Sequence, residues 1–212
     1  MSLLPLGPGW MSRIERVLLH FPSSRLEPSG AREDLCRFLD LVVTWNQRMD
    51  LTAARSEDEL VDLMLADAAM LAQGSVDRGR HWMDIGTGAG APGVALALLA
   101  PELRITLVEP RQKRVSFLRT ALSTLKRADV ALKRCRSEDL PPASCDVAVS
   151  RATLSPPDWL AEGARLATEA VWVLLARDPA PALAGCTADR NIDYVWPLTG
   201  AARRAVRFVH QR

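Results

Sequence analysis

The sequence has little of what a metal-binding, disulfide-stabilised or membrane-spanning protein needs. Its four cysteines (Cys36, Cys135, Cys145 and Cys186) form no CxxC pair, and its three histidines are equally scattered. This spacing predicts free thiols in a reducing compartment and no metal site. The longest apolar run, residues 94–100, is far shorter than the roughly 20 residues of a membrane helix. Because the start also lacks the basic region of a signal peptide, we expect a soluble cytoplasmic protein with no membrane partner.

Neither charge sign dominates, and aromatic residues are few. The 212 residues carry a formal net charge of +2, with 25% charged, 48% hydrophobic and 5% aromatic residues. This balance argues against disorder and predicts a globular chain with a sizeable core. Basic residues gather at 111–136 and in the tail from 203 to 212, whereas acidic residues gather at 57–62. A modest net charge can therefore still present one positive face to phosphates, although no aromatic residues interleave with it to stack bases.

The pattern changes near residue 80. Before it, residues 31–47 carry apolar side chains at helical spacing, and Ser56 with Glu59 forms a capping box that begins a further helix. Residues 1–74 are therefore predicted to form a helical cap or arm. Residues 75–212 are predicted to form one compact domain.

From residue 81 onward, short apolar strands alternate with amphipathic helices. Strands are predicted at 81–85, 104–108, 130–132, 146–149 and 170–175, and helices at 93–99, at 111–126 and after Ser155. Such alternation predicts an α/β fold with a mostly parallel sheet and helices on both faces. The tail differs, because residues 192–196 and 205–210 flank Gly200 without a helix between them. This arrangement predicts a C-terminal antiparallel hairpin.

The glycine-rich segment at residues 84–93, DIGTGAGAPG, lies between the first predicted strand and the helix after it. Glycine allows a sharp turn there and a close approach of the backbone to a ligand. Glu109 ends the next strand, where a carboxylate can bind both hydroxyls of a ribose. Asp84 precedes the turn and suits a hydrogen bond toward a cationic amino-acid group. Both features predict a nucleoside site that accepts S-adenosylmethionine.

The same glycine segment leaves two alternatives open. Gly86, Gly88 and Ala91 also satisfy the dinucleotide fingerprint, so a nicotinamide-dependent oxidoreductase is a rival, and a plain turn that binds nothing is a second. Pro92 removes an N–H from the helix start, where a pyrophosphate needs donors. The predicted closing hairpin is also more typical of a methyltransferase sheet. Both observations favour the methyl donor.

Five short motifs occur in a characteristic order. They are WN..MDLTA at 45–53, the glycine segment at 84–93, KR..FL at 113–118, RSED at 136–139 and SRA at 150–152. The series resembles the glucose-inhibited division protein B family, 16S rRNA guanine-N7 methyltransferases that use S-adenosylmethionine. This resemblance implies a Rossmann-like class I methyltransferase sheet, with 16S rRNA or the small ribosomal subunit as partner. We expect the chain to act as a monomer.

Candidate site residues follow from the motifs and the resemblance together. The expected cofactor-binding residues are Asp84, Gly86, Gly88, Gly90, Ala91, Glu109, Ser137, Glu138 and Arg151. Arg151, which ends the fourth predicted strand, is also the expected catalytic residue. The expected RNA-binding residues are Lys113, Arg114, Arg203 and Arg204. Trp45 and Asn46 are predicted to be structural, and Asp67 is predicted to be a solvated helix residue.

This chain departs from the usual family pattern at 63–67, where a histidine is missing, and at 175–177 and 203–204. These positions are expected to face RNA or the active site. Two further functions therefore stay open: a related methyltransferase acting on another RNA or on a small molecule, and a non-catalytic RNA-binding protein. Guanine N7 carries a free lone pair at neutral pH, so its methylation needs no general base. The missing histidine therefore does not by itself abolish catalysis.

Overall fold

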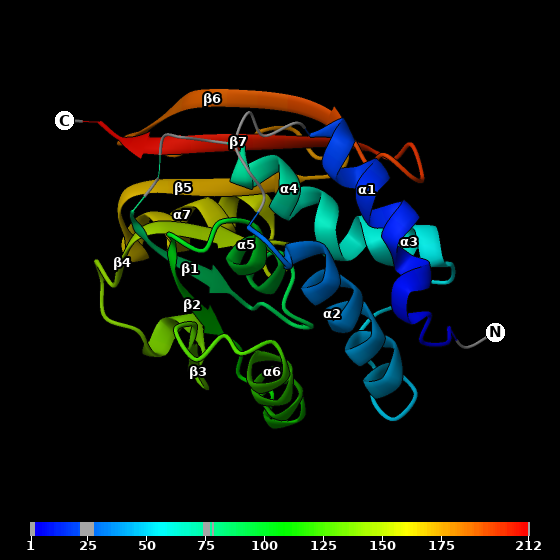
Figure 1. Ribbon diagram of the computed structural model, residues 1–212. Helices are drawn as coiled ribbons and strands as arrows, with labels where there is room; N and C mark the ends of the chain where they lie inside the picture. The colour runs from blue at the N-terminus through cyan, green and yellow to red at the C-terminus, as the bar shows by residue number, and fades with distance from the viewer. Residues whose placement is uncertain (1–2, 22–27, 74–76, 78, 212) are drawn as a thin grey trace.

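The computed structural model describes residues 3–21, 28–73, 77 and 79–211, and its centre is one seven-stranded sheet with helices on both faces (Figure 1). The boundary predicted at residue 74 lies outside the described residues. The four cysteines are free, as their spacing predicts. Within the described ranges, no helix combines the length and the hydrophobicity needed to cross a membrane.

The N-terminal helices pack against one face of the sheet. They begin with a 3₁₀ turn, η1 (Gly7–Trp10), followed by α1 (Met11–His20), α2 (Ala31–Asn46), α3 (Glu57–Val61), η2 (Asp62–Ala66) and α4 (Asp67–Ala72). The predicted N-cap is confirmed, because Ser56 Oγ accepts a hydrogen bond from Glu59 N at 3.1 Å, but the Glu59 carboxylate accepts from Arg55 N at 2.8 Å in place of the reciprocal bond of a capping box. The helix predicted to follow it is not uniform, since η2 is a turn of π-helix between α3 and α4. Such turns are rare and recur at functional sites.

The strand order is β3-β2-β1-β4-β5-β7-β6. The parallel strands are β1 (His81–Ile85), β2 (Arg104–Val108), β3 (Ala131–Lys133), β4 (Cys145–Ser150) and β5 (Ala167–Leu175). The predicted C-terminal hairpin is confirmed as β6 (Cys186–Val195) and β7 (Ala202–His210), with β7 antiparallel to both β5 and β6. Its strands are longer than the predicted segments. The first half of β6 is an exposed edge whose pairing with β7, rather than an apolar pattern, fixes it.

Three helices connect the parallel strands: α5 (Gly93–Leu99), α6 (Gln112–Thr124) and α7 (Pro156–Leu166). One hydrophobic cluster joins the N-terminal helices, α5 and α6 to the sheet, and a second cluster lies between the sheet and α7. A 3₁₀ turn, η3 (Ser137–Asp139), follows β3. From the neighbouring strands β1 and β4, the chain continues outward through β2 and β3 on one side and through β5 on the other. Ligands bind at such a switch point, beyond the carboxyl ends of the strands.

One arginine of the basic tail is not on the surface. Arg207 of β7 is 5% exposed, and its guanidinium pairs with Asp77 at 2.6 Å and with Asp189. Trp172 of β5 also donates from Nε1 to Asp77 at 3.1 Å. The expectation that the whole tail forms a positive face is therefore wrong for Arg207. Its guanidinium forms an internal ion pair that connects β7 to the segment before β1.

Candidate active site

The glycine turn after β1 is held against the end of β2. Gly86 N and Thr87 N both donate to Val108 O, at 2.8 and 3.1 Å. Gly86 and Gly88 have φ values of +68° and +60°, in the left-handed region that favours glycine. Gly86 also lies directly beneath Thr153, since a Cβ there would be 2.5 Å from the Thr153 methyl group. The turn therefore needs glycine for both conformation and space.

Gly90 and Asp84 stabilise the turn from its buried side. A Cβ on Gly90 would be 2.5 Å from a methyl group of Val94, so this glycine lets the turn pack on α5. Asp84 is 1% exposed, and its Oδ2 accepts from Thr87 Oγ1 at 2.6 Å and from Gly93 N at 2.8 Å. Its Oδ1 is buried and has no hydrogen-bond partner among the described residues. This burial raises the pKa of Asp84 to about 6.

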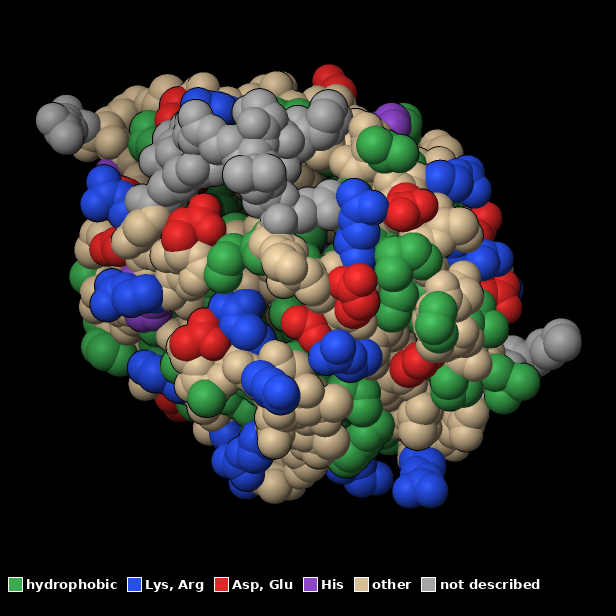
Figure 2. All heavy atoms as spheres, in the orientation of Figure 1, with side chains coloured by type: hydrophobic (Ala, Val, Ile, Leu, Met, Phe, Trp, Pro, Cys, Tyr) green, Lys and Arg blue, Asp and Glu red, His purple; other side chains and the backbone are tan. Residues whose placement is uncertain are grey.

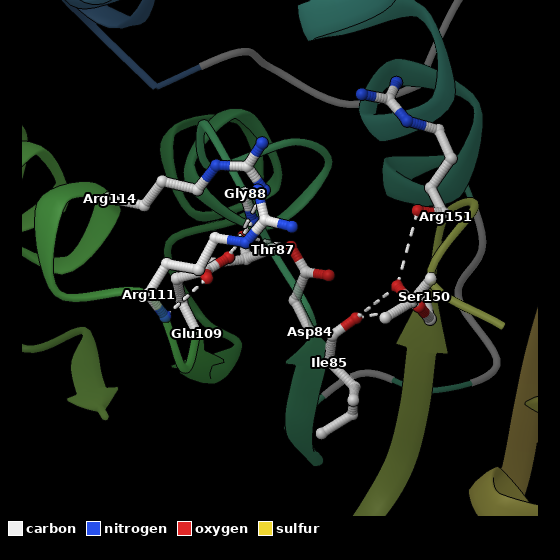
Figure 3. Close-up of polar contacts among 10 residues, drawn as sticks. Asp84, Ile85, Thr87, Gly88, Glu109, Arg111, Arg114, Ser150 and Arg151 are labelled. Carbon is white, nitrogen blue, oxygen red and sulfur yellow. Dashed lines mark hydrogen bonds and ion pairs between the residues drawn. The ribbon is translucent and has the colours of Figure 1, made fainter. Parts of the chain in front are cut away.

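A cavity of about 510 Å³ opens above the glycine turn. It brings together five of the predicted cofactor-binding residues: Gly86, Gly88, Ala91, Glu109 and Arg151. Asp84 and Gly90 lie beneath the turn rather than on the cavity wall. Glu109 is 2% exposed, and its carboxylate accepts from Gly88 N at 3.0 Å and from Arg111 N at 2.8 Å (Figure 3). These two bonds fix the carboxylate against the wall of the cavity.

Of two pairs of predicted residues, one separates in the structure and the other stays together but away from this cavity. Arg114 lines the cavity, with its guanidinium 3.8 Å from Glu109, whereas Lys113 is exposed on α6. Ser137 and Glu138 lie in η3 and are not among the cavity-lining residues. The Ser137 carbonyl accepts from Arg165 of α7 at 2.9 Å. An adenine-binding role for η3 stays a prediction.

The segment after α2 forms a further wall of the cavity, which the motif at residues 45–53 did not predict. Leu51, Thr52 and Ala53 line the cavity. Asn46 holds this segment, because its Oδ1 accepts from Leu51 N at 2.8 Å and from Thr52 N at 2.9 Å. An asparagine at the end of a predicted helix, where the backbone N–H groups of the following residues have no helical partner, is the sequence signal for such a bond. Trp45 packs edge-on against Phe117, with ring centroids 5.8 Å apart, and is structural as predicted.

Arg151 follows β4 and reaches the N-terminal helices (Figure 3). Its Nη1 lies 3.2 Å from Asp67 Oδ2 and also donates to the Leu63 carbonyl in the π turn. Asp67 is 2% exposed, so the prediction of a solvated helix residue is wrong. Burial of its carboxylate is compensated by donors from the hairpin, Tyr194 Oη at 2.8 Å and Trp196 Nε1 at 2.9 Å. Burial, together with the neighbouring Asp67, raises the pKa of Tyr194 and keeps it a proton donor.

A second cavity, of about 280 Å³, lies at the ends of β4 and β5. It shares Leu63 and residues 151–153 with the first cavity. Arg203, predicted to bind RNA, lines this second cavity and stacks its guanidinium 3.7 Å from the ring centroid of Trp196. Arg204, its predicted companion, instead pairs with Asp193 on the surface at 2.6 Å.

Exposed cations gather beside α6 and β3. Figure 2 shows Lys and Arg side chains along the lower edge of the molecule, in the region of these two elements. The exposed basic residues there are Arg111, Lys113, Arg119, Lys126, Lys133, Arg134 and Arg136. The predicted gathering of exposed cations is confirmed for these residues, whereas Arg114 lines the cavity and Arg127 is half-buried and paired with Asp129 at 2.6 Å.

The strand order, with β7 inserted antiparallel between β5 and β6, defines the Rossmann-like class I methyltransferase fold. A SAM-dependent methyltransferase from Aquifex aeolicus superposes with a TM-score of 0.53 and 18% identity, over 71% of this chain and 92% of that one. The 1,6-didemethyltoxoflavin N1-methyltransferase of Burkholderia thailandensis superposes with a TM-score of 0.56 and 14% identity, over 89% of this chain and 92% of that one. The chain belongs to the GidB family, described as rRNA small subunit methyltransferase G, whose model matches residues 31–175.

Curated relatives carry the same description. Ribosomal RNA small subunit methyltransferase G of Stutzerimonas stutzeri is 36% identical over 126 residues, and that of Cereibacter sphaeroides is 37% identical over 148. The first alignment covers 59% of each chain, and the second covers 68% of this chain and 69% of the relative. The chain thus spans about three-fifths of the first relative's length in that match.

Proposed function

We propose that the chain transfers a methyl group from S-adenosylmethionine to N7 of a guanosine in small-subunit rRNA. Membership of the GidB family supports the reaction and the substrate class. The observation that carries the donor assignment is the 510 Å³ cavity, in which Glu109 and the glycine turn face the same space. One chain lines both cavities, so a monomer suffices, and the ribosomal substrate places the reaction in the cytoplasm.

The cavity residues fit this donor. Each oxygen of the Glu109 carboxylate accepts one backbone N–H, which leaves acceptor capacity on both oxygens for ribose hydroxyls. Gly88 presents bare backbone, and even a Cβ there would be 3.6 Å from its nearest neighbour. The buried Oδ1 of Asp84 adds negative potential beneath the turn. Arg111, Arg114 and Arg151 also line the cavity, so its charge does not separate the two cofactors, and membership of the GidB family is what argues against the oxidoreductase alternative.

When bound, S-adenosylmethionine supplies a methyl group on a positively charged sulfur, which makes that carbon open to attack by a lone pair. The residues of this chain then have to bind and orient, because guanine N7 has no proton to lose. Arg151 lies where the two cavities meet, so it is placed to orient the acceptor beside the donor. Correct orientation alone can supply several kcal/mol, roughly 7 or more, toward the reaction barrier.

The exposed cations on α6 and β3 supply the contact with RNA. Side chains such as Lys113 and Arg119 can neutralise backbone phosphates without reading the sequence of bases. The target base has to leave its stack before its N7 can approach the donor methyl group, and this unstacking costs a few kcal/mol. Phosphate contacts close to the cavity offset that cost.

The test uses 16S rRNA, and small subunits, from a strain that lacks the gene. With radiolabelled S-adenosylmethionine, the wild-type protein should label the RNA, and aniline should cleave the borohydride-reduced product at one guanosine. The Arg151→Ala variant should retain affinity for S-adenosylhomocysteine and lose roughly a hundredfold in turnover. Label on another RNA, or binding without transfer, would favour the related-methyltransferase or non-catalytic alternative. Unchanged turnover in Arg151→Ala would remove Arg151 from the active site.

A further inference from the structure

The second cavity has the composition of a small-molecule pocket. Its walls are largely apolar and aromatic, from Trp159, Tyr194, Trp196 and the end of β5, and its charged groups are Asp67, Arg151, Asp178 and Arg203. Such a balance suits a flat ligand that is fixed by a small number of hydrogen bonds. The cavity meets the proposed donor cavity at Arg151 and Thr153. A group bound in each cavity would therefore meet its partner at this border.

We propose that this second cavity takes the acceptor base, extruded from RNA, and that Asp67 is the positioning residue that holds Arg151 and the closing hairpin around it. Because this inference rests on the proposed function, the base is a purine whose N7 faces the donor. Within the described part of the chain, the hydrogen bonds of the Arg151 guanidinium use Nη1 alone. Its other N–H groups are available to an acceptor oxygen such as guanine O6.

Asp67 is the point at which the wall elements join. Its two oxygens receive Arg151 from the loop after β4, and Tyr194 and Trp196 from β6 and the turn after it. Three donors on one carboxylate restrict all three side chains at once. Without the carboxylate, Arg151 would keep only the Leu63 carbonyl as a described partner. It would then be free to leave the border between the cavities.

Asp67 also balances charge during the reaction. The N7 lone pair forms the new N–CH₃ bond, and the electron pair of the S–CH₃ bond stays on sulfur. Positive charge therefore moves from the donor to the base. A lone guanidinium beside the base would oppose that change, whereas Arg151 with Asp67 at 3.2 Å forms a neutral pair. Loss of the Asp67 charge should thus slow the methyl-transfer step more than it weakens donor binding.

Asp62 offers a matched control. It is also a fully buried carboxylate, lies in the π turn before Asp67, and holds the same hairpin through Leu198 N and Thr199. It does not contact Arg151. Asp67→Asn and Asp62→Asn therefore remove the same charge, from the same helical segment, against the same hairpin. The contact with Arg151 is present in the first case and missing in the second.

The experiment measures kcat and KM for methylation of 16S rRNA, and the Kd for S-adenosylhomocysteine. Asp67→Asn should lower kcat roughly a hundredfold, whereas Asp62→Asn should lower it less than about threefold, with the Kd unchanged in both. Asp67→Glu should recover part of the lost kcat, because it restores the charge. Equal losses in the two asparagine variants would show that Asp67 only supports the hairpin, and would overturn the inference.

A second variant tests the cavity without touching the buried network. Ala176 is exposed at the mouth of the second cavity and does not line the first. Ala176→Phe should therefore lower kcat/KM for RNA at least about tenfold, because the larger side chain obstructs the base, while the Kd for S-adenosylhomocysteine stays at the wild-type value. Full activity in Ala176→Phe would overturn the assignment of the cavity. If the wild-type protein binds no donor or methylates no RNA, the proposed function fails instead.

Discussion

Replacing Gly86 by alanine tests how the turn after β1 is built. Gly86 has φ +68°, where a Cβ costs roughly 1 to 2 kcal/mol. The same Cβ would lie 2.5 Å from Thr153 Cγ2 and 2.7 Å from Thr153 Oγ1, so Thr153 must move. Movement breaks its hydrogen bonds to Ser150 and to the Ile85 carbonyl, each worth about 1 kcal/mol. We expect the free energy of unfolding to fall by about 3 kcal/mol.

Gly88→Ala is the matched control. Gly88 has a similar φ of +60°, but its Cβ would be 3.6 Å from the nearest atom, an ordinary contact. It should cost only the backbone term, roughly 1 to 2 kcal/mol, in urea unfolding followed by circular dichroism. In a Thr153→Ala background, Gly86→Ala should fall to the same value. Equal costs for Gly86→Ala and Gly88→Ala in the wild-type background would refute the steric reasoning.

Two further predictions concern buried charge. Asp77→Ala removes the main buried partner of Arg207 and should lower the free energy of unfolding by about 3 kcal/mol. Asp193→Ala, at an exposed ion pair, should leave the urea midpoint nearly unchanged. Similar shifts in the two variants would contradict this account. Burial raises the pKa of Asp84 from 3.8 to about 6, so the folded protein binds that proton more tightly than the unfolded chain. Its contribution to stability is therefore full below pH 3.8 and is lost as the pH rises through 6. The stability of wild type relative to Asp84→Asn should fall by about 2.5 kcal/mol between pH 4 and pH 8, and a pH-independent difference would contradict the assignment.

The parallel half of the fold is predictable from sequence because each strand is a short buried run between turn residues. β1, β2 and α5 have the predicted bounds. Local pattern fails where pairing decides the structure. In β6, residues 187–191 are exposed and form strand only because β7 supplies their backbone partners. The π turn η2 has no local signal either, since its residues carry an ordinary helical pattern.

The same division holds for the site. Glu109 and the glycine turn are predictable, because a strand end and a bare backbone are local features. Asp67 is not, because its burial depends on Tyr194 and Trp196, which meet it only after the hairpin has closed the sheet. The expectation that Arg207 lies on the surface fails for the same reason, since its partner Asp77 is on a distant segment of the chain. A charged residue at helical or strand spacing is read as solvated unless its partner is known.

The two cavities are built largely from different stretches of chain. Residues 86–114 supply most of the first cavity, and residues 150–203 supply most of the second. Under the proposed function, a substitution at the mouth of the second cavity, such as one at Ala176, changes the acceptor side and leaves the residues of the donor side untouched.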